Sequence, residues 1–289
     1  MKISMLMPTL NRRELMYAAV KSILAQTYKD FEIIIVDQSD CSNETISDLD
    51  QRIKYYHIDE KGLSHARNVG LSYVTGDIVG LMDDDAYYTE HVLESIAKKF
   101  QNSDIGFVSG VVMDPIDDKI TLPGMDNRPK EINSLNILKC CISPSMFLRA
   151  NLVKKLGFDE DLGIGCFWGS AEETDIALQY LYNDMKGYFE PSIIVRHKGD
   201  DPKTISMDKL RSYSRGFGAV CCKHSHMYRN RKMLYLFFRA LFRAAGGLVL
   251  GIMKADKQMI HYYIVSLVSK LEGYKSYKTQ RIINVEKYF

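Results

Sequence analysis

The sequence lacks the features of several specialised classes of protein. None of its six cysteines has the C-x-x-C spacing of a zinc or redox site, and four of them form two adjacent pairs, Cys140–Cys141 and Cys221–Cys222. The amino-terminal stretch MKISMLMPTLN has no charged segment followed by a long apolar run, so it predicts no signal peptide. Both observations favour a cytoplasmic protein with reduced thiols.

A strong net charge is also lacking. The 289 residues carry a net charge of +2, and 46% of them are hydrophobic, which is typical of a soluble protein with a sizeable core. The charge is unevenly distributed, because residues 203–254 contain eleven Lys and Arg against one acid, Asp208. This excess predicts a polyanionic partner, either nucleic acid or an anionic lipid surface.

What is present is an alternation of strand-like and helix-like segments over the first two thirds of the chain. Apolar strands such as KISMLM and FEIIIVD are separated by segments of helical spacing such as RRELMYAAVKSILAQ. This alternation predicts an α/β fold with a mostly parallel sheet flanked by helices. We expect this domain to span residues 1–200, and a helical carboxyl-terminal extension to span residues 201–289.

Polar residues follow three predicted strands at their carboxyl ends, where ligands bind in such sheets. Thr9, Asn11 and Arg12 end or follow the first strand, Asp37 ends the second, and Asp83–Asp85 follow the strand DIVGLM. We therefore expect these side chains to lie close together. The irregular stretch of residues 114–136 is typical of a lid or of a segment that binds the acceptor.

The three adjacent carboxylates favour a bound cation. Burying them unpaired would be costly, because like charges repel and a buried charge loses its hydration. On an extended segment, residues i and i+2 point the same way, so we expect Asp83 and Asp85 to face one point while Asp84 turns aside. Such oxygen ligands, completed by phosphate oxygens, suit Mg²⁺ or Mn²⁺. A solvated acidic loop is the alternative.

Six segments, taken in order, resemble glycosyltransferase family 2, the inverting nucleotide-sugar transferases of GT-A fold. They are PTLNR, IIIVDQSD, GLSHARNVGL, GLMDDDA, GFDEDLGIG and SAEETDIAL, and they extend from about Lys2 to His197. The order and spacing carry the resemblance, because each segment alone is a weak signal. It implies a metal-dependent hexosyltransferase of cell-surface polysaccharide synthesis, with a nucleotide-sugar donor and a glycan or lipid-linked saccharide acceptor.

The resemblance also implies roles for single residues. Thr9, Asn11 and Arg12 would line the nucleotide pocket, and Arg67 would lie near the nucleotide or its diphosphate, where a guanidinium makes charge-assisted hydrogen bonds. Asp37 would accept a hydrogen bond from the pyrimidine base. A carboxylate at a strand end can accept from an imide N–H, which favours uracil or thymine, and we expect a UDP-sugar.

The acidic motif is assigned by the same resemblance. Asp83 would face the ribose, Asp84 would belong to the same donor pocket, and Asp85 would bind the metal ion. His197 would be a further contact to the metal or diphosphate, although a histidine at a strand end is often structural. The family often has an Asp where this chain has Ala86, so fewer carboxylate ligands are present.

A catalytic base is expected at the start of the helix EETDIALQYLYN. The family commonly has Glu-Asp-x-Asp there, with the second acid as base, and this role falls on Glu173, with Glu172 near the acceptor. Acids in a first helical turn also favour the helix dipole, which is the structural alternative. Trp168, the only tryptophan, is expected either to stack against an acceptor sugar or to pack in the core.

The carboxyl-terminal extension combines apolar and basic residues. Arg239 and Arg243 interrupt its apolar stretch, and the uninterrupted part, Ala244–Met253, has about half the length that spans a bilayer. This pattern favours a helix in the membrane interface, and a helix packed on the catalytic domain is the alternative. We expect a protein peripheral to the inner face of the cell membrane, with a polyprenyl-diphosphate-linked acceptor.

Two other functions fit single features of the sequence. A phosphohydrolase would use the Asp cluster as nucleophile and metal ligands, but it needs an Asp at the end of the first strand, where this chain has Pro8 and Thr9. A nucleic-acid-binding protein would explain the basic tail and leave the strand-end acids unexplained. We therefore expect no nucleic-acid partner.

Overall fold

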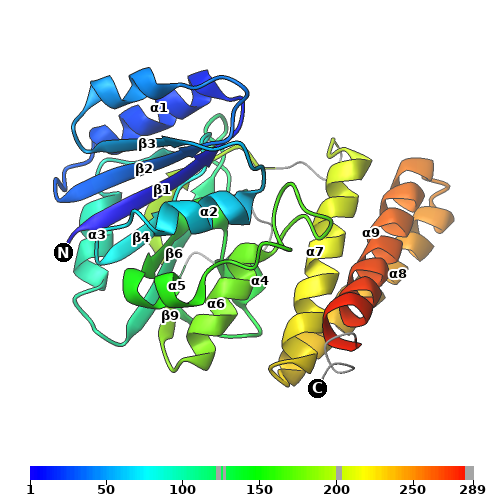
Figure 1. The fold of residues 1–289 in the computed structure, drawn as a ribbon. Helices are drawn as coiled ribbons and strands as arrows, with labels where there is room; N and C mark the ends of the chain where they lie inside the picture. Colours follow the sequence, from blue (N-terminus) through cyan, green and yellow to red (C-terminus); the bar gives the residue numbers. More distant parts are fainter. Residues whose placement is uncertain (122–124, 126–127, 200–203, 284–289) are drawn as a thin grey trace. The chain divides into compact units, whose positions relative to one another are not determined.

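The computed structural model describes residues 1–121, 125, 128–199 and 204–283. The chain forms two compact units (Figure 1), of which the first contains residues 1–158 and 173–200 and the second residues 159–172 and 201–289. The division into residues 1–200 and 201–289 that the sequence suggests stays a prediction. Residues 159–172 group with the helical unit.

The first unit is built on a mixed sheet with strand order β3-β2-β1-β4-β8-β6-β9-β5, in which β7 also pairs with β9. The strands are β1 (Ile3–Thr9), β2 (Phe31–Asp37), β3 (Ile53–His57), β4 (Ile78–Leu81), β5 (Tyr87–Tyr88), β6 (Ile105–Met113), β7 (Lys130–Ile132), β8 (Met146–Arg149) and β9 (Lys186–Arg196). Within the group β1 to β4, every pair of neighbouring strands is parallel, and β6 is parallel to β9. Strand β8 lies between β4 and β6 and is antiparallel to both. The predicted α/β fold is therefore confirmed, with the parallel order concentrated in its first half.

The stretch of residues 114–136 contains more structure than the sequence predicted. Its segment β7 pairs antiparallel with β9, which makes this part an edge of the sheet. Residues 122–124 and 126–127 lie outside the described residues, so the predicted lid or acceptor segment falls partly outside them.

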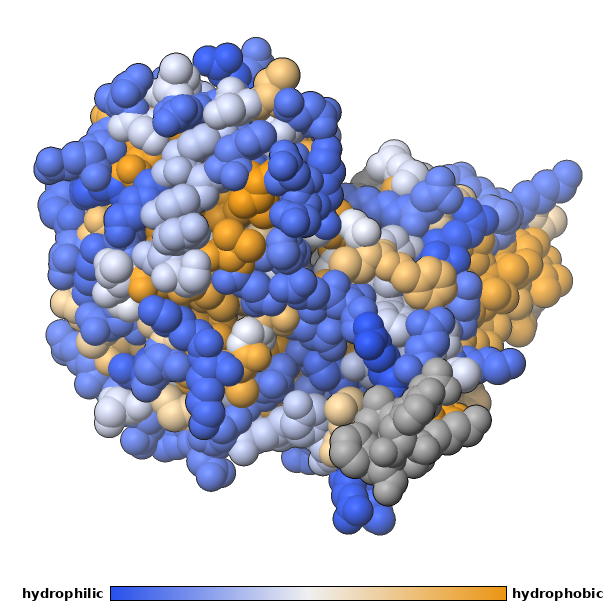
Figure 2. Space-filling model, viewed as in Figure 1, coloured by the Kyte–Doolittle hydropathy of each residue, from blue (hydrophilic) through white to orange (hydrophobic). Residues whose placement is uncertain are grey.

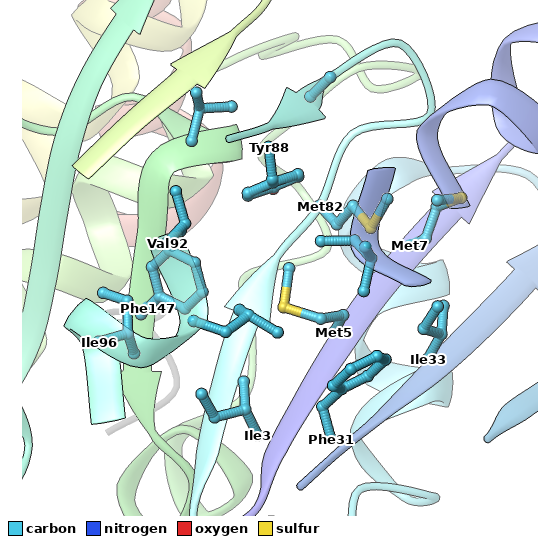
Figure 3. Packing of buried hydrophobic residues seen from close by; sticks show 14 of the residues in the cluster. Ile3, Met5, Met7, Phe31, Ile33, Met82, Tyr88, Val92, Ile96 and Phe147 are labelled. Carbon is cyan, nitrogen blue, oxygen red and sulfur yellow. The ribbon is translucent and has the colours of Figure 1, made fainter. Parts of the chain in front are cut away.

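Helices cover the sheet and pack on it through apolar stripes. In the first unit they are α1 (Arg13–Leu24), α2 (Leu63–Leu71), α3 (Val92–Lys99), α4 (Ile137–Cys140), α5 (Ala150–Leu156) and α6 (Glu172–Tyr182), together with the 3₁₀ turns η1 (Glu44–Leu49) and η2 (Ser143–Ser145). Figure 3 shows Val92 and Ile96 of α3 close to Phe147 of β8, within the buried cluster that also holds β1 and β2. Gly70 allows α2 to lie directly on β1, because a Cβ there would be 2.2 Å from Leu6 Cδ1.

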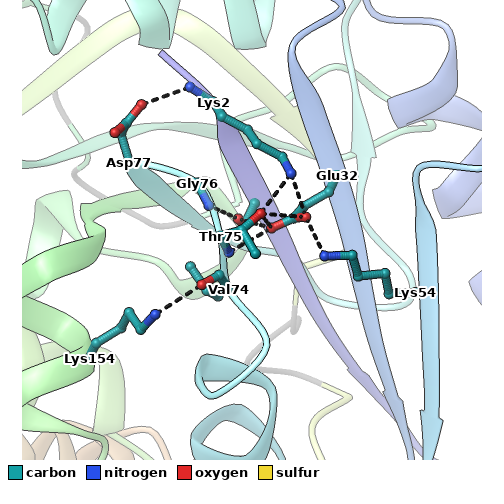
Figure 4. Close-up of polar contacts among 9 residues, drawn as sticks. Lys2, Glu32, Lys54, Val74, Thr75, Gly76, Asp77 and Lys154 are labelled. Carbon is teal, nitrogen blue, oxygen red and sulfur yellow. Dashed lines mark hydrogen bonds and ion pairs between the residues drawn. The ribbon is translucent and has the colours of Figure 1, made fainter.

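A buried carboxylate joins the amino ends of the parallel strands (Figure 4). Glu32 of β2 is 2% exposed, and its Oε2 accepts from Lys2 Nζ at 2.7 Å and Lys54 Nζ at 2.8 Å. Its Oε1 accepts from the Ser4 hydroxyl at 2.6 Å and from the Thr75 N–H at 2.8 Å. Burial alone would raise the pKa of Glu32, but these hydrogen bonds hold it far below its usual range.

We expect Glu32→Gln to lower the free energy of unfolding by roughly 2–3 kcal/mol at pH 7, because charge-assisted hydrogen bonds are lost at a buried position. The folded-state pKa lies below the unfolded one, so this stabilisation is fully present above the ordinary pKa of about 4.3 and fades as the pH falls below it. Urea unfolding at pH 7 and pH 3 should show the difference shrinking in acid. The exposed variant Glu60→Gln is the control, and equal stability of both variants at pH 7 would contradict the expectation.

The second unit is a helical bundle of α7 (Met207–His226), α8 (Arg231–Met253) and α9 (Lys257–Tyr277), followed by a π-helical segment, η3 (Lys278–Ile283). Helices α7 and α9 approach each other closely, because a Cβ on Gly218 or Gly273 would lie 2.2 or 2.1 Å from a backbone oxygen of the other helix. Asp159 joins this unit by accepting from Lys223 Nζ at 2.7 Å. The predicted helical extension is thus present.

Candidate active site

The loops that follow β1 and β2 are joined at the carboxyl edge of the sheet. Thr9 and Asp37, the last residues of these strands, are paired in register. Asn11 adopts a positive φ of 54°, which asparagine tolerates, and its backbone N–H donates to Ser39 Oγ at 2.7 Å. Its side-chain amide donates to Asp40 Oδ2 and accepts from the Asp40 N–H, both at 3.0 Å. Asn11 therefore holds the two loops together.

The acidic motif forms a turn and not an extended segment. Strand β4 ends at Leu81, and the Ala86 N–H donates to the Asp83 carbonyl at 3.2 Å, which closes a turn over the three acids. The prediction that Asp83 and Asp85 face the same side of an extended segment is therefore wrong. Asp83 and Asp85 point to different partners, and Asp84, expected to turn aside, is directed inward with 6% exposure.

Asp84 and Asp85 are brought into one polar cluster with residues distant in sequence. Asp84 accepts from Thr9 Oγ1 at 2.7 Å and from Arg12 Nη1 at 3.1 Å. Asp85 accepts from the same Arg12 nitrogen at 3.0 Å, and its Oδ1 lies 3.0 Å from His197 Nε2. The predicted convergence is therefore present for Thr9, Arg12, Asp84 and Asp85. His197, which the convergence argument did not include, joins them through Asp85.

Exposure distinguishes the two carboxylates of this cluster. The Asp85 side chain is 31% exposed and that of Asp84 is 8% exposed, so Asp85 is the acid that a ligand can reach. Burial raises the pKa of Asp84, and the Thr9 hydrogen bond and the Arg12 charge only partly offset it. Burial also tends to raise the pKa of Asp85, but the hydrogen bond and charge of His197 and the charge of Arg12 outweigh this effect. The pKa of Asp85 is therefore lowered, and the group stays ionised at neutral pH.

This donor set fits a divalent cation that is shared with a substrate. Among the described residues, no group of three or more His, Cys, Asp and Glu side chains is arranged to hold a metal ion by itself. Asp85 and His197 supply one carboxylate and one imidazole in contact, a combination that suits Mn²⁺ or Mg²⁺ when diphosphate oxygens and water complete the shell. The positive charge of Arg12 lies beside the same carboxylate.

Arg67 is a buried residue that contacts Asp83. Its side chain has no exposed surface, and its guanidinium lies 5.4 Å from the Phe158 ring centroid. Its Nη2 donates to Ser143 Oγ at 2.5 Å and to Asp83 Oδ1 at 3.4 Å, and the Ser143 hydroxyl donates to the same oxygen at 3.3 Å. Arg67 is therefore buried against Asp83 and Ser143, and its position near the nucleotide or diphosphate stays a prediction. The sequence carries no local signal for Ser143, whose partners are 60 and 76 residues away.

Asp37 is enclosed by its own loop. It is fully buried, its Oδ2 accepts from Asn43 at 2.8 Å and Tyr55 at 2.7 Å, and its Oδ1 accepts from the Ser39 N–H at 2.8 Å. Burial would raise the pKa of Asp37, but these hydrogen bonds lower it. A base can reach this carboxylate only after local rearrangement of one of these donors, and the contact with a pyrimidine stays a prediction.

Helix α6 presents Glu173 in its first turn. The helix is anchored by Tyr180, whose hydroxyl donates to the Arg149 carbonyl at 2.6 Å and whose ring meets Phe107 edge-on. Glu173 is half-buried, whereas Glu172 is 4% exposed, so Glu173 is the more accessible acid of this pair and Glu172 has little surface to offer an acceptor. Glu173 also acts on Cys141, whose pKa is raised first by burial and then by the neighbouring charges of Cys140 and Glu173.

Trp168 packs in a buried cluster of the second unit. It belongs to the second unit, where it is 3% exposed, its indole N–H donates to Ser276 Oγ at 2.9 Å, and its ring lies 4.8 Å from that of Tyr277. With the ring covered in this way, stacking against an acceptor sugar is corrected to core packing. Its neighbour Phe167 is 49% exposed.

Comparison with known proteins identifies the family. Residues 4–157 match the family model described as glycosyl transferase family 2. The match covers both the strands and the polar turns described above, from β1 to α5. The chain belongs to glycosyl transferase family 2.

Curated relatives match over 32–39% of the chain. An uncharacterised glycosyltransferase of Rickettsia conorii is 40% identical over 98 residues, 32% of this chain and 16% of that protein. The GalNAc(5)-diNAcBac-PP-undecaprenol beta-1,3-glucosyltransferase of Campylobacter jejuni is 35% identical over 34% of each chain. The glucosyl-dolichyl phosphate glucuronosyltransferase of Haloferax volcanii is 31% identical over 39% of each chain. The matched region thus covers less than half of each of these proteins.

Solved structures share the fold. A mannosyltransferase from Pyrobaculum calidifontis, in complex with GDP-Man and Mn²⁺, has a TM-score of 0.63 at 17% identity, covering 93% of this chain and 86% of that one. TarS of S. aureus, in complex with UDP-GlcNAc, has a TM-score of 0.64 at 15% identity, covering 96% and 92%. The similarity establishes a GT-A-like architecture for this chain.

Proposed function

We propose that this protein is a metal-dependent inverting glycosyltransferase, which transfers a sugar from a nucleotide-diphosphate sugar to a hydroxyl of a glycan or lipid-linked saccharide. The observation that carries the proposal is the accessible carboxylate of Asp85, held against Arg12 and His197 where the strands end. Support comes from the family and from structural neighbours whose bound ligands are GDP-Man with Mn²⁺ and UDP-GlcNAc.

The donor would be held by the turns at the carboxyl edge. Asn11 fixes the loops after β1 and β2, between which the nucleoside would lie. Asp83, held in place by Arg67 and Ser143, would accept hydrogen bonds from ribose hydroxyls. We take UDP as the nucleotide, because a strand-end carboxylate such as Asp37 favours a base with an imide N–H.

The divalent ion, when bound at Asp85 and His197, would neutralise charge that grows on the leaving diphosphate. The chain's own acid–base work falls to Glu173, which takes the proton from the acceptor hydroxyl. The acceptor oxygen forms a bond to the anomeric carbon as the bond from that carbon to the diphosphate oxygen breaks on the opposite face. The configuration is thereby inverted, and the nucleoside diphosphate leaves.

A lipid-linked saccharide is the acceptor class that we favour. The names of two relatives contain a dolichyl phosphate and a PP-undecaprenol group, and those relatives match over 39% and 34% of this chain. The product would be a lipid-linked oligosaccharide for cell-surface polysaccharide. No described feature favours a phosphohydrolase, because β1 ends at Thr9 and not at an Asp nucleophile.

The proposal is tested by incubating the purified protein with UDP-, GDP- and dTDP-sugars, Mn²⁺ and polyprenyl-diphosphate-linked acceptors. We expect acceptor-dependent release of UDP and a product whose new linkage, read by the NMR coupling of its anomeric proton, has the anomeric configuration opposite to that of the donor. A product that retains the configuration would refute the inverting mechanism. Hydrolysis of phosphate esters without transfer to any acceptor would refute the enzyme class.

Arg12 is expected to compete with the metal ion for Asp85. Its guanidinium is 52% exposed, and such pairs are worth about 0.2–1 kcal/mol, so Arg12→Gln should raise the affinity of nucleotide-free protein for Mn²⁺ up to about fivefold. Free Mn²⁺ measured by electron paramagnetic resonance gives the affinity. Lys61→Gln, which removes an exposed partner of Asp40, is the control. Unchanged or weaker Mn²⁺ binding by Arg12→Gln would contradict the competition.

A further inference from the structure

Helix α8 is apolar on two opposite faces. One face is buried in the second unit, with Met233, Leu236, Phe237 and Ala244. The other is exposed, and it includes Phe242 and Met253 at 77% exposure, together with further large apolar side chains, Tyr235, Phe238, Val249, Leu250 and Ile252. A surface helix of a soluble protein normally has polar residues opposite its buried stripe. Something apolar is therefore needed to cover this face.

The neighbouring helix α9 adds a second exposed stripe. Ile264, Val268 and Leu271 are 43%, 56% and 45% exposed and follow one another at spacings of four and three residues, which places them on one side of the helix. Helices α8 and α9 pack together closely, because a Cβ on Gly247 would lie 2.2 Å from the Tyr263 ring. In Figure 2 the area over these helices is coloured as apolar. We call the exposed apolar residues of α8 and α9 the apolar face.

Positive charge accompanies the apolar face. Helix α8 contains four cations and no acid, and two lysines flank the turn to α9; these cations are Arg231, Lys232, Arg239, Arg243, Lys254 and Lys257. The one acid in this stretch, Asp256, caps α9 by accepting from the Met259 N–H at 3.0 Å. A partner that covers the face must therefore be apolar within and anionic at its surface.

We propose that the apolar face of α8 and α9 docks on the surface of an anionic lipid bilayer, with its apolar side chains among the acyl chains and its cations among the headgroups. A second copy of this chain fits less well, because a self-complementary interface would bring the cations of α8 against each other. The proposal goes beyond the donor site and does not depend on it.

The helix would lie in the plane of the membrane. By length and composition α8 is sufficient to cross a bilayer, and only 22% of its most apolar window is buried. In a spanning helix, however, Arg239 and Arg243 would lie near the centre of the bilayer, where a charged side chain is costly. A helix that lies in the interface lets both guanidiniums reach the headgroups while its opposite face stays packed against α7 and α9.

Docking would give the protein a peripheral position on the cytoplasmic face of the cell membrane. A bilayer surface is also where a lipid-linked acceptor of the proposed class is held. Binding to the surface would confine the enzyme and its acceptor to one plane, which raises their effective concentration without any new contact at the active site.

Flotation of the full chain with vesicles tests the proposal. The vesicles contain phosphatidylcholine alone or phosphatidylcholine with phosphatidylglycerol. We expect the protein to float with the anionic vesicles. The double variant Phe242→Glu, Met253→Glu should lose roughly tenfold or more in affinity, because two large apolar side chains are withheld from the membrane. Arg239→Gln with Arg243→Gln should lose roughly thirtyfold on anionic vesicles, at about 1 kcal/mol for each cation.

Controls separate docking from folding and from donor binding. Ile116→Glu changes an 83% exposed apolar residue of the first unit and should float like the wild type. All variants should keep their thermal stabilisation by nucleotide, if they show any, since the changed residues are outside the donor site. Wild-type protein that floats with neither vesicle, or the two α8 double variants floating as the wild type does, would overturn the proposal.

Two further measurements address the rival occupants. If the apolar face joined two copies, the wild type would be a dimer by light scattering, and Phe242→Glu with Met253→Glu would produce a monomer without altered flotation. If α8 spanned the bilayer, the protein would resist extraction from membranes by alkaline carbonate. Either result overturns docking in the membrane plane, whereas a protein released by carbonate that floats through its apolar face supports it.

Discussion

Asp85→Asn should abolish metal-dependent stabilisation by nucleotide and lower kcat/KM by roughly 10³-fold, because about 4 kcal/mol of charge stabilisation on the leaving diphosphate is lost. Asp85 is the more exposed of the two acids that contact Arg12, and its Oδ1 lies 3.0 Å from His197 Nε2. The amide keeps the size of the side chain and removes its charge. Initial rates with a saturating acceptor and varied donor give kcat/KM.

Matched variants show whether the loss is specific to Asp85. Asp104→Asn changes an exposed acid that pairs with the exposed Lys186 where β6 and β9 begin, and it should retain wild-type activity. A rate for Asp85→Asn within a factor of ten of the wild type would remove Asp85 from the proposed metal site.

Glu173→Gln should lower kcat by roughly 10²–10⁴-fold, since the acceptor hydroxyl loses its general base. The carboxylate stands in the first turn of α6, half-buried, while its neighbour Glu172 is nearly fully buried. Because the variant leaves the donor turns intact, stabilisation by nucleotide and Mn²⁺ should be unchanged. Single-turnover rates beside thermal shifts separate the chemical step from donor binding.

The conservative variant Glu173→Asp sharpens this test. Asp keeps the carboxylate on a side chain that is one bond shorter, so Glu173→Asp should restore part of the rate that Gln loses, provided that the carboxylate itself is the base. Equal losses in Gln and Asp variants would point to a structural role for Glu173 at the helix terminus. A fully active Glu173→Gln would exclude it as the base.

The parallel half of the fold could be predicted because its signals are local. Each of β1, β2 and β4 is a short apolar run, and helical spacing between the runs implies crossover connections. The antiparallel insertion of β8 between β4 and β6 could not be predicted in this way. Its partners are distant in sequence, and an apolar run does not specify its neighbour.

The site shows the same limit at the level of single residues. The convergence of Thr9, Arg12, Asp84 and Asp85 follows from their positions at strand ends, and the structure brings them together with His197. The direction of each carboxylate depends on the turn that closes at Ala86, and an extended strand contains no such turn.

Burial was the property hardest to infer. Arg67 lies within a helical segment whose pattern is compatible with an exposed or a buried arginine, and only the packing against Phe158 with the partners Ser143 and Asp83 decides between them. Trp168 likewise follows no periodic element. Its cover comes from Ser276 and Tyr277, more than a hundred residues away.

The central claim, that the strand-end cluster is a metal-dependent nucleotide-sugar site, is tested most directly by thermal shift. Purified protein and Asp85→Asn would be heated with UDP, GDP, CMP or dTDP, with and without Mn²⁺. A ligand that binds only the folded state raises the melting temperature, by about 2.7 kcal/mol of stabilisation at a hundredfold excess over Kd. We predict a shift with UDP that requires both Mn²⁺ and Asp85. No shift with any nucleotide at millimolar Mn²⁺, or an equal shift in Asp85→Asn, would contradict the account.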